Sequence, residues 1–139
     1  MIILDTKALS ALTRAEPEMA VVRWLDRQPV SSIWTTSITP MEIRYGLQSM
    51  PPGRRREQMT QEVEAVLREE IEGRYASFDI AAAEQAAELM ALRRRQGRPV
   101  ELRDTMIAAI ALASRATLAT HNTSDFKDLS VTVVNPWEA

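Results

Sequence analysis

Short apolar segments with β-strand character alternate along this chain with segments of helical spacing. The first, Met1–Leu4, ends directly at Asp5, and Ile33–Thr36 is rich in strand-forming residues. Thr117–Thr120 and Val131–Val134 have the same character near the C-terminus. Strands that alternate with helices are typical of right-handed crossovers between parallel strands. The pattern therefore predicts an α/β fold with three α/β/α layers and a small central parallel sheet.

The segments between these strands carry the apolar spacing and the capping signals of helices. Thr39, Pro40 and Glu42 fit the N-cap, first and third positions of a helix, which is the pattern of a capping box. The first four helices are expected at 8–14, 17–28, 40–50 and 59–71, and Pro51-Pro52-Gly53 separates the last two.

A fifth helix is expected to begin after Asp79, which is suited to cap it, and to be terminated by Gly97 and Pro99. A sixth, Glu101–Arg115, is apolar nearly all round between Ile107 and Ala113, so it is predicted to be central and covered. The apolar stripe expected on the fifth helix consists of Ala83, Ala87, Met90 and Ala91.

Composition limits the chemistry that is available to this chain. A length of 139 residues favours one domain, spanning 1–139. Cysteine is absent and His121 is the only histidine, which excludes disulfides, a thiol nucleophile, a cysteine-based zinc site and a multi-histidine metal site. Any chemistry must therefore come from carboxylates, hydroxyls, arginines and the backbone.

Charge and hydropathy indicate the surroundings in which the chain works. No basic and apolar leader is recognisable, and the longest apolar run, Met106–Ala113, is too short to cross a membrane, so a cytoplasmic location is expected. The net charge is −2, yet the arginines cluster at Arg54-Arg55-Arg56 and Arg93-Arg94-Arg95. Such clusters are candidate phosphate ligands for a nucleic-acid substrate, or else solvated helix surface.

Four carboxylates stand out by their positions. Asp5 follows a predicted strand, Asp125 follows another, and Glu42 lies just beyond a third, so all are expected at the carboxyl edge of the sheet. Each has an ordinary interpretation as a capping or turn residue. Asp104 differs, because it shares a helix face with the apolar residue Ile107 and is expected to point inward.

A buried carboxylate needs either a cationic partner or a proton. For Asp104 the partner is an inward arginine, such as Arg44 or Arg103, or a metal ion shared with the other acids. Two carboxylates 4 Å apart repel each other by roughly 4 kcal/mol at an effective dielectric constant of 20, so a cluster of them calls for a cation. Oxygen ligands favour Mg²⁺ or Mn²⁺, and the reaction class that fits them is phosphodiester hydrolysis.

Four short motifs succeed one another along the chain. They are Asp5-Thr6 after Met1–Leu4, Thr36-Ser37-Ile38-Thr39 with Glu42, Asp104 with Ile107-Ala108-Ala109, and Asn122-Thr123 with Asp125-Phe126. In this order they resemble the motifs of PIN-domain nucleases, and specifically of VapC-type toxins of bacterial toxin–antitoxin pairs, including the FitB-like branch. Gly97-Arg98-Pro99 and Asn135-Pro136-Trp137 are similar to that branch as well.

The resemblance implies a PIN-like α/β/α domain that cleaves RNA with Mg²⁺ or Mn²⁺, forms a homodimer and is inhibited by a cognate antitoxin. Carried over to this chain, Asp5, Glu42 and Asp104 match the three main acidic positions, which makes them the implied metal ligands. Asp125 matches the fourth acidic position of the catalytic set, beside Asn122, where the family has Asp or Asn. The supporting polar residues are Thr6, Ser37, Asn122 and Thr123, of which Thr6 and Ser37 are expected to bond to the carboxylates or to metal-bound water.

Two positions depart from the family pattern. The family usually has Asn where this chain has Lys7, and frequently Arg where it has His121. An ammonium group beside the acids can compete with a metal, so a catalytically weak PIN-like domain that binds RNA or its antitoxin is the alternative function. A phosphoryl-transfer domain with Asp5 as phosphate acceptor is disfavoured, because no second acid flanks Asp5.

Overall fold

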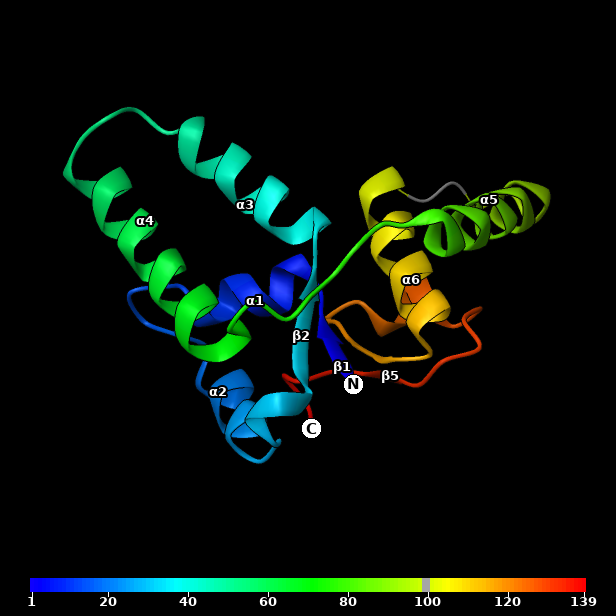
Figure 1. Ribbon diagram of the computed structural model, residues 1–139, viewed down its shortest axis with the longest axis horizontal. Helices are drawn as coiled ribbons and strands as arrows, with labels where there is room; N and C mark the ends of the chain where they lie inside the picture. Colours follow the sequence, from blue (N-terminus) through cyan, green and yellow to red (C-terminus); the bar gives the residue numbers. More distant parts are fainter. Residues whose placement is uncertain (99–100) are drawn as a thin grey trace.

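A five-stranded parallel sheet lies at the centre of the computed structural model, which describes residues 1–98 and 101–139 (Figure 1). The strand order is β3-β2-β1-β4-β5, and every neighbouring pair is parallel. The predicted class of sheet is thereby confirmed. The strands are β1 (Ile2–Leu4), β2 (Ile33–Thr36), β3 (Tyr75–Ala76), β4 (Thr117–Ala119) and β5 (Val133–Val134).

Helices connect these strands and cover both faces of the sheet. The pair α3 and α4 lies on one side of the strands in Figure 1, and the pair α5 and α6 lies on the other. The helices are α1 (Thr6–Leu12), α2 (Met19–Asp26), α3 (Ile38–Gln48), α4 (Arg54–Val66), α5 (Ile80–Arg95) and α6 (Leu102–Ser114). Shorter helical segments are η1 (Val30–Ser32), the π-helical η2 (Leu67–Ile71) and η3 (Thr123–Phe126).

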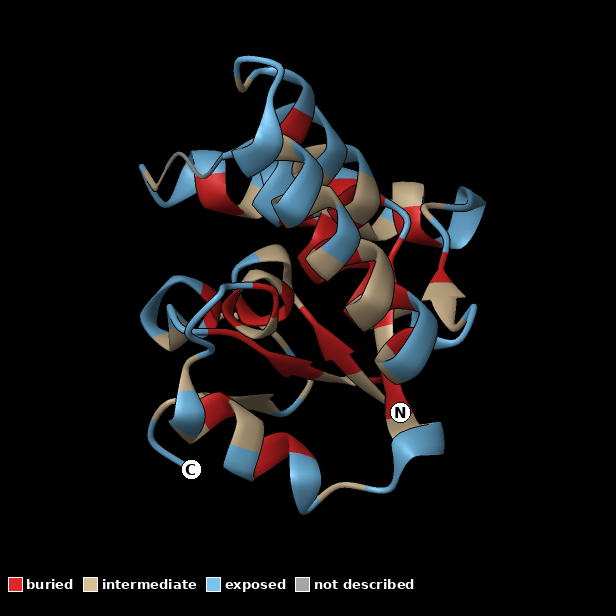
Figure 2. Ribbon diagram, turned by 90° about the vertical axis from the view of Figure 1, so that its left-hand side faces the viewer, coloured by how far each residue is buried: buried red, intermediate tan, exposed pale blue. Residues whose placement is uncertain are grey.

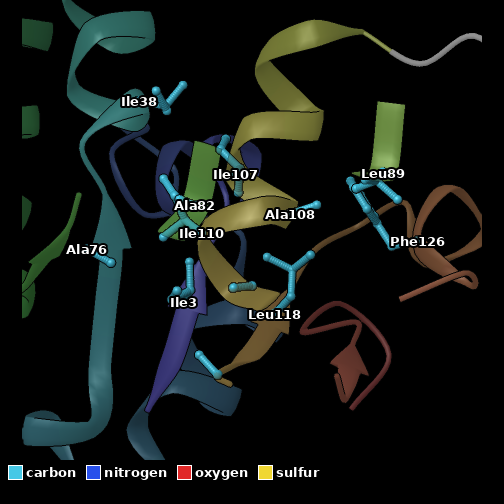
Figure 3. Close-up of a cluster of buried hydrophobic side chains, with 12 residues drawn as sticks. Ile3, Ile38, Ala76, Ala82, Leu89, Ile107, Ala108, Ile110, Leu118 and Phe126 are labelled. Carbon is cyan, nitrogen blue, oxygen red and sulfur yellow. The ribbon is translucent and has the colours of Figure 1, made fainter. Parts of the chain in front are cut away.

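Two buried clusters fill the space between the sheet and these helices. Successive side chains of a strand point to opposite faces, so Ile3 joins the cluster beneath α5 and α6, whereas Leu4 joins the cluster beneath α1, α2 and α4. Figure 3 shows the first cluster, in which Ile107 and Ile110 of α6 lie beside Ile3. The buried residues in Figure 2 concentrate in the strands and in the helix faces that meet them.

The topology brings several polar residues to one edge of the sheet. The chain passes from β1 to β2 and β3 on one side, and later returns to the other side of β1 with β4 and β5. In open parallel sheets, functional groups gather beyond the strand ends at such a switch point. Asp5 is the first residue after β1, and its amide donates to the Ala119 carbonyl of β4, which fixes it at this point.

The observed elements differ from the predicted ones mainly at their ends and in one strand. β3 was not predicted, because two residues that pair only with the edge of β2 leave no periodic signal. α2 begins at Met19, two residues after Pro17, and α5 ends at Arg95 before Gly97, which has a φ of 65°. Pro99, the other expected terminator, lies outside the described residues.

The buried face of α5 is also displaced from the predicted stripe. Met90, Ala87 and Ala91 are exposed, and Ala83 is only partly buried. Alanine occurs on every face of this helix, so its apolar spacing gives little contrast, and the true stripe contains a charged residue that obscures it. The buried residues are Ala82, Ala86, Leu89 and Arg93.

None of the helices formed by the described residues is long and apolar enough to span a bilayer. α6 is the most apolar of the long helices, and its segment Ile107–Ala111 is fully covered by protein, as predicted. The last two residues of the predicted stretch, Leu112 and Ala113, are only partly buried.

Candidate active site

Asp5 stands at the start of α1 and is held by the backbone. Its Oδ1 accepts a hydrogen bond of 2.8 Å from the Ala8 amide, so the ordinary interpretation as an N-cap is confirmed. Burial raises the pKa of the Asp5 carboxyl, which the Thr120 hydroxyl, the Ala8 amide and the charge of Lys7 partly offset, whereas Glu42 adds to it. Capping fixes the orientation of this carboxyl at the end of β1.

Glu42 lies on the second turn of α3 and turns toward α1. Its Oε1 accepts a hydrogen bond of 2.7 Å from the Thr6 hydroxyl, whose oxygen is also 3.0 Å from Thr39 Oγ1. α3 begins at Ile38 with Ser37 in the capping position, so the predicted capping box of Thr39 and Glu42 is wrong. Glu42 therefore does not cap its own helix, and its side chain contacts Thr6, the residue that follows Asp5.

Asp104 lies in the first turn of α6, where the predicted inward burial is wrong. The residue is exposed, although Ile107 and Ala108 behind it are buried. Neighbouring protein atoms still displace much of the water around its carboxyl, and with the charges of Glu101, Glu42, Asp5 and Asp125 they raise its pKa to about 6. No ion pair of Asp104 occurs among the described residues, so neither Arg44 nor Arg103 neutralises it.

Asp125 is the remaining predicted acid and lies in η3, beyond the end of β4. It is exposed, and its negative charge contributes to the raised pKa of Asp104, which places the two carboxylates in one electrostatic field. Asn122 is exposed and directly precedes η3, and its backbone N–H donates to Thr120 Oγ1 at 3.2 Å. Thr123 is half-buried in the first position of η3.

Ser37 is exposed and lies at the N-cap position of α3. Its hydroxyl accepts a hydrogen bond of 3.2 Å from the Phe78 amide, at the connection between β3 and α5. No hydrogen bond joins Ser37 to a carboxylate among the described residues, and its contact with metal-bound water stays a prediction. The hydroxyls that do approach Glu42 come from Thr6 and, through it, Thr39.

Glu42 has a cationic neighbour that was not predicted for it, the guanidinium of Arg103, the residue directly before Asp104. The Arg103 guanidinium is 2.9 Å from Glu101 and 3.8 Å from Glu42 Oε2. The Glu101 side chain in turn accepts a hydrogen bond from the Asp104 amide and so caps α6. The position of Glu101 three residues before Asp104 is the sequence signal that could have identified Glu101 as the cap of α6. Lys7 is exposed and forms no ion pair with the described residues.

The predicted phosphate-binding arginines fall into two groups. Arg54, Arg55, Arg94 and Arg95 are exposed, and Arg56 is half-buried. Arg93 is only 2% exposed and forms an ion pair of 3.0 Å with Asp128. Its guanidinium is occupied by protein groups, so the prediction that Arg93 contacts substrate is wrong.

His121 follows β4 and packs against the C-terminal segment. Its ring meets the edge of Trp137 with centroids 4.5 Å apart and an interplanar angle of 77°. The ring is exposed and forms no hydrogen bond through its nitrogens to the described residues, while its backbone carbonyl accepts from Asn135.

The acidic residues match a hard divalent cation in chemistry, although no three of them are close enough among the described residues to enclose one. Carboxylate oxygens are preferred ligands of Mg²⁺ and Mn²⁺, and Mg²⁺ is commonly held by one or two carboxylates with water in its remaining positions. Burial is the main cause of the raised pKa values of Asp5 and Asp104, and the neighbouring acids add to both, so that a cation here would stabilise the charged forms. The donor set fits an open site of this kind.

The structure is thus an α/β domain with a parallel sheet, and Asp5, Glu42, Asp104 and Asp125 lie near the switch point of that sheet. The chain belongs to the PIN domain family, whose model matches residues 2–131. It is 38% identical to the VapC ribonuclease Y4jK of Sinorhizobium fredii over 99% of both chains, and 40% identical to the plasmid stability protein StbB of Pseudomonas syringae pv. tomato over all of both.

Solved structures lead to the same family. The crystal structure of FitAcB from Neisseria gonorrhoeae matches all of this chain and all of its own with a TM-score of 0.88 and 30% identity. Toxin FitB of that organism is 31% identical over 99% of both chains. The resemblance found in the four motifs is thereby confirmed, and so is the α/β/α fold that it implied.

Proposed function

We propose that this chain is a metal-dependent endoribonuclease and the toxin component of a type II toxin–antitoxin pair. Two observations outside the site support it: the chain is alike over its full length to a VapC ribonuclease and to toxin FitB. The observation that carries the chemistry is the gathering of acids around Asp104 at the end of the sheet: desolvation raises the pKa of its carboxyl to about 6, and the charges of Glu101, Glu42, Asp5 and Asp125 add to that rise. A cluster of this kind is suited to Mg²⁺ or Mn²⁺.

Each acid has a separate role in this proposal. Asp5, Glu42 and Asp104 are the proposed ligands of the cation, with water between the carboxylates and the cation where the open site leaves room for it. Asp125 completes the acidic set from η3. The Ala8 amide fixes the Asp5 carboxyl, and the Thr6 hydroxyl fixes that of Glu42, so that two of the three ligands are oriented before any cation arrives. Asp104 is the least restrained of the three and is the one that must lose its proton near neutral pH.

When bound, Mg²⁺ or Mn²⁺ supplies positive charge that activates water for attack on a phosphodiester and stabilises the charge that develops on phosphorus oxygens. The chain has to hold the RNA close to its own acidic residues, which repel phosphate. The exposed arginines Arg54, Arg55, Arg94 and Arg95, with the half-buried Arg56, are the proposed RNA contacts.

An antitoxin partner and a homodimer complete the proposal. Structures similar to this chain include a toxin–antitoxin complex from Klebsiella pneumoniae and FitAB bound to a DNA fragment. A protein antitoxin is therefore proposed as the partner that inhibits cleavage. Light scattering of the purified chain, alone and with the candidate antitoxin, measures both the homodimer and the complex.

The decisive experiment is cleavage of a structured RNA with an exposed single-stranded loop, since sequence-specific RNA recognition usually targets such loops. Cleavage is expected with Mg²⁺ or Mn²⁺, and is expected to be abolished by EDTA and by Asp5→Asn. A wild-type chain that binds RNA or antitoxin at saturating Mg²⁺ and Mn²⁺ but leaves the RNA intact would establish the alternative, a catalytically weak binding module.

A further inference from the structure

Arg93 is a charged side chain in the interior of the molecule, on α5, which carries none of the proposed catalytic acids. Its exposed fraction is 2%, and that of its partner Asp128 is 9%. An arginine is almost never fully buried unless it is paired, and its guanidinium offers five donors in a fixed plane. The acceptors of those donors show which segments the side chain joins.

The guanidinium joins three segments of the chain. Nε and Nη2 donate to the two carboxylate oxygens of Asp128 at 3.0 and 3.2 Å, which makes a bidentate ion pair. Nη2 also donates to the backbone carbonyl of Asp125 at 2.8 Å, and Nη1 donates to Thr105 Oγ1 at 3.3 Å. The centre of the guanidinium lies 5.7 Å from the ring centroid of Phe126.

Two of these contacts fall next to the acids of the site. Thr105 directly follows Asp104 in the first turn of α6, and its hydroxyl also donates to the Glu101 carbonyl. The second contact is with the main chain of Asp125 itself. Asp104 and Asp125 are exposed, and no described residue joins their carboxylates to each other, so their separation depends on how α6 and η3 are held.

We propose that Arg93 is a positioning residue for the acidic cluster: its buried guanidinium holds the first turn of α6 and the η3 segment to α5, and thereby sets the distance between Asp104 and Asp125. The catalytic consequence of this inference rests on the proposed function, whereas the structural role of Arg93 rests only on its hydrogen bonds. Arg93 cannot touch RNA from its buried position, so it acts only through the two acids.

Lysine cannot replace this arginine. An ammonium group keeps the positive charge that Asp128 requires, but it is a single point and cannot reach a carboxylate, a carbonyl and a hydroxyl that lie in three directions. Arg93→Lys therefore separates the charge of Arg93 from its geometry. Thr105→Val is a milder change of nearly equal volume, which removes the hydroxyl that receives Nη1 and with it the hydrogen bond to the Glu101 carbonyl.

The first measurement is backbone hydrogen exchange in the metal-free protein, which depends on neither metal nor RNA. Arg93→Lys is expected to speed exchange of the Thr105 and Asp125 amides at least tenfold, while the Leu9 amide at the start of α1 changes less than twofold. Thr105→Val is expected to affect α6 alone. Arg68→Lys, the same substitution at an exposed arginine on η2, is the matched control and is expected to change none of these amides.

The second measurement is binding of Mn²⁺, followed by its electron paramagnetic resonance signal, together with RNA cleavage. Arg93→Lys is expected to weaken Mn²⁺ affinity about tenfold and to lower kcat with KM unchanged, because the RNA contacts remain. Asp128→Asn is expected to reproduce both effects in part, since it frees the guanidinium from its charged partner.

The outcomes separate the two proposals. A uniform rise in exchange across the molecule, or wild-type Mn²⁺ affinity and kcat in a variant whose two segments have loosened, would overturn the positioning role and leave Arg93 as a core residue. A wild-type protein that neither binds Mn²⁺ nor cleaves RNA would refute the proposed function, and hydrogen exchange alone would then decide what Arg93 holds. If Arg93→Lys does not fold, Thr105→Val supplies the same comparison for α6.

Discussion

The hydroxyl of Thr6 donates a hydrogen bond of 2.7 Å to Glu42 Oε1 and so connects the first residue of α1 with the second turn of α3. Thr6 also follows Asp5 directly, which means that a single residue links the two acids that are 37 positions apart in the chain (42 minus 5). Thr39 adds a second hydroxyl 3.0 Å from Thr6 Oγ1. The orientation of Glu42 is therefore set by tertiary contacts, not by the helix on which it lies.

Replacement of this hydroxyl is expected to cost both stability and metal affinity. Thr6→Val removes the donor at nearly constant volume, so the free energy of unfolding should fall by about 1.5–3 kcal/mol, the usual net worth of a hydrogen bond to a charged group. Glu42 loses its restraint, and cleavage at limiting Mg²⁺ should fall more than cleavage at saturating Mg²⁺. Urea unfolding and a Mg²⁺ titration measure the two effects. Thr6→Ser keeps the hydroxyl and should resemble the wild type; equal losses in both variants would contradict the prediction.

The charge of Asp104 is expected to destabilise the metal-free fold at neutral pH. Its pKa is raised from 3.8 to about 6, so the folded protein binds this proton more tightly than the unfolded chain does. The contribution of Asp104 to stability is therefore most favourable below about pH 4 and is lost as the pH rises through 6. Asp104→Asn should unfold at higher urea than the wild type at pH 8, and the two should converge near pH 4.

Mg²⁺ provides the complementary test of the same carboxylate. A cation that binds only the folded state raises the melting temperature, so 10 mM Mg²⁺, a concentration on the order of usual assay levels, should stabilise the wild type at pH 8 and have little effect on Asp104→Asn. Asp79→Asn serves as a control, because Asp79 caps α5 and is not among the charges that shift the pKa of Asp5 or Asp104. A large loss of stability of metal-free Asp104→Asn at pH 8 would instead indicate a structural role.

Metal affinity itself should depend on pH with a break near 6. A proton on Asp104 competes with the cation, and the raised pKa of about 6 moves this competition into an accessible range. Apparent Mn²⁺ affinity should be constant from pH 7 to 8 and fall by up to about tenfold per pH unit below 6. Isothermal titration at several pH values measures it. A break near pH 4 would mean that the carboxyl titrates like an isolated aspartate.

The exposed arginines are expected to determine the salt dependence of RNA binding. Each phosphate contact contributes about 0.7 to the slope of log affinity against log salt concentration for a single strand, so Arg54→Ala/Arg55→Ala and Arg94→Ala/Arg95→Ala should each flatten it by about 1.4. Arg23→Ala on α2 is the control at an exposed arginine. Unchanged slopes in both double variants would show that these side chains are solvated surface.

Arg93→Ala should behave differently from those variants, although Arg93 belongs to the same run in the sequence. Removal of one partner of a buried pair leaves Asp128 charged and uncompensated, which typically costs about 3–5 kcal/mol of folding free energy. Thermal unfolding should therefore show a large loss, whereas Arg94→Ala should unfold like the wild type.

The fold could be predicted because its signals are local. Met1–Leu4 and Thr117–Thr120 are apolar and short, and helical patterns separate them, which leaves a parallel sheet as the consistent architecture. β3 could not be predicted, since two residues carry no period. The buried face of α5 was misplaced because alanine covers all its sides and because Arg93, a charged residue, belongs to the core.

The candidate site could be predicted in part for the same physical reason. Residues just after parallel strands meet at one edge, so Asp5 and Asp125 were expected together without any knowledge of their contacts. Contacts between distant segments have no such signal: neither the bond from Thr6 to Glu42 nor the ion pair of Arg103 with Glu42 follows from spacing. The roles of the four acids stay a prediction until they are substituted.

The cation that competes with metal at this site should be Arg103 and not Lys7. Lys7 is exposed and lacks an ion pair within the described residues, whereas the Arg103 guanidinium is 3.8 Å from Glu42 Oε2. An exposed ion pair is worth less than about 1 kcal/mol, so Arg103→Gln should tighten Mg²⁺ binding by no more than about fivefold. Lys7→Asn, which introduces the residue usual in the family, should change it by less than about twofold. Cleavage rates measured against Mg²⁺ concentration for the three proteins decide between the two cations. A greater effect of Lys7→Asn would mean that its ammonium group reaches the acids in solution, and that the flexible side chain spends much of its time there.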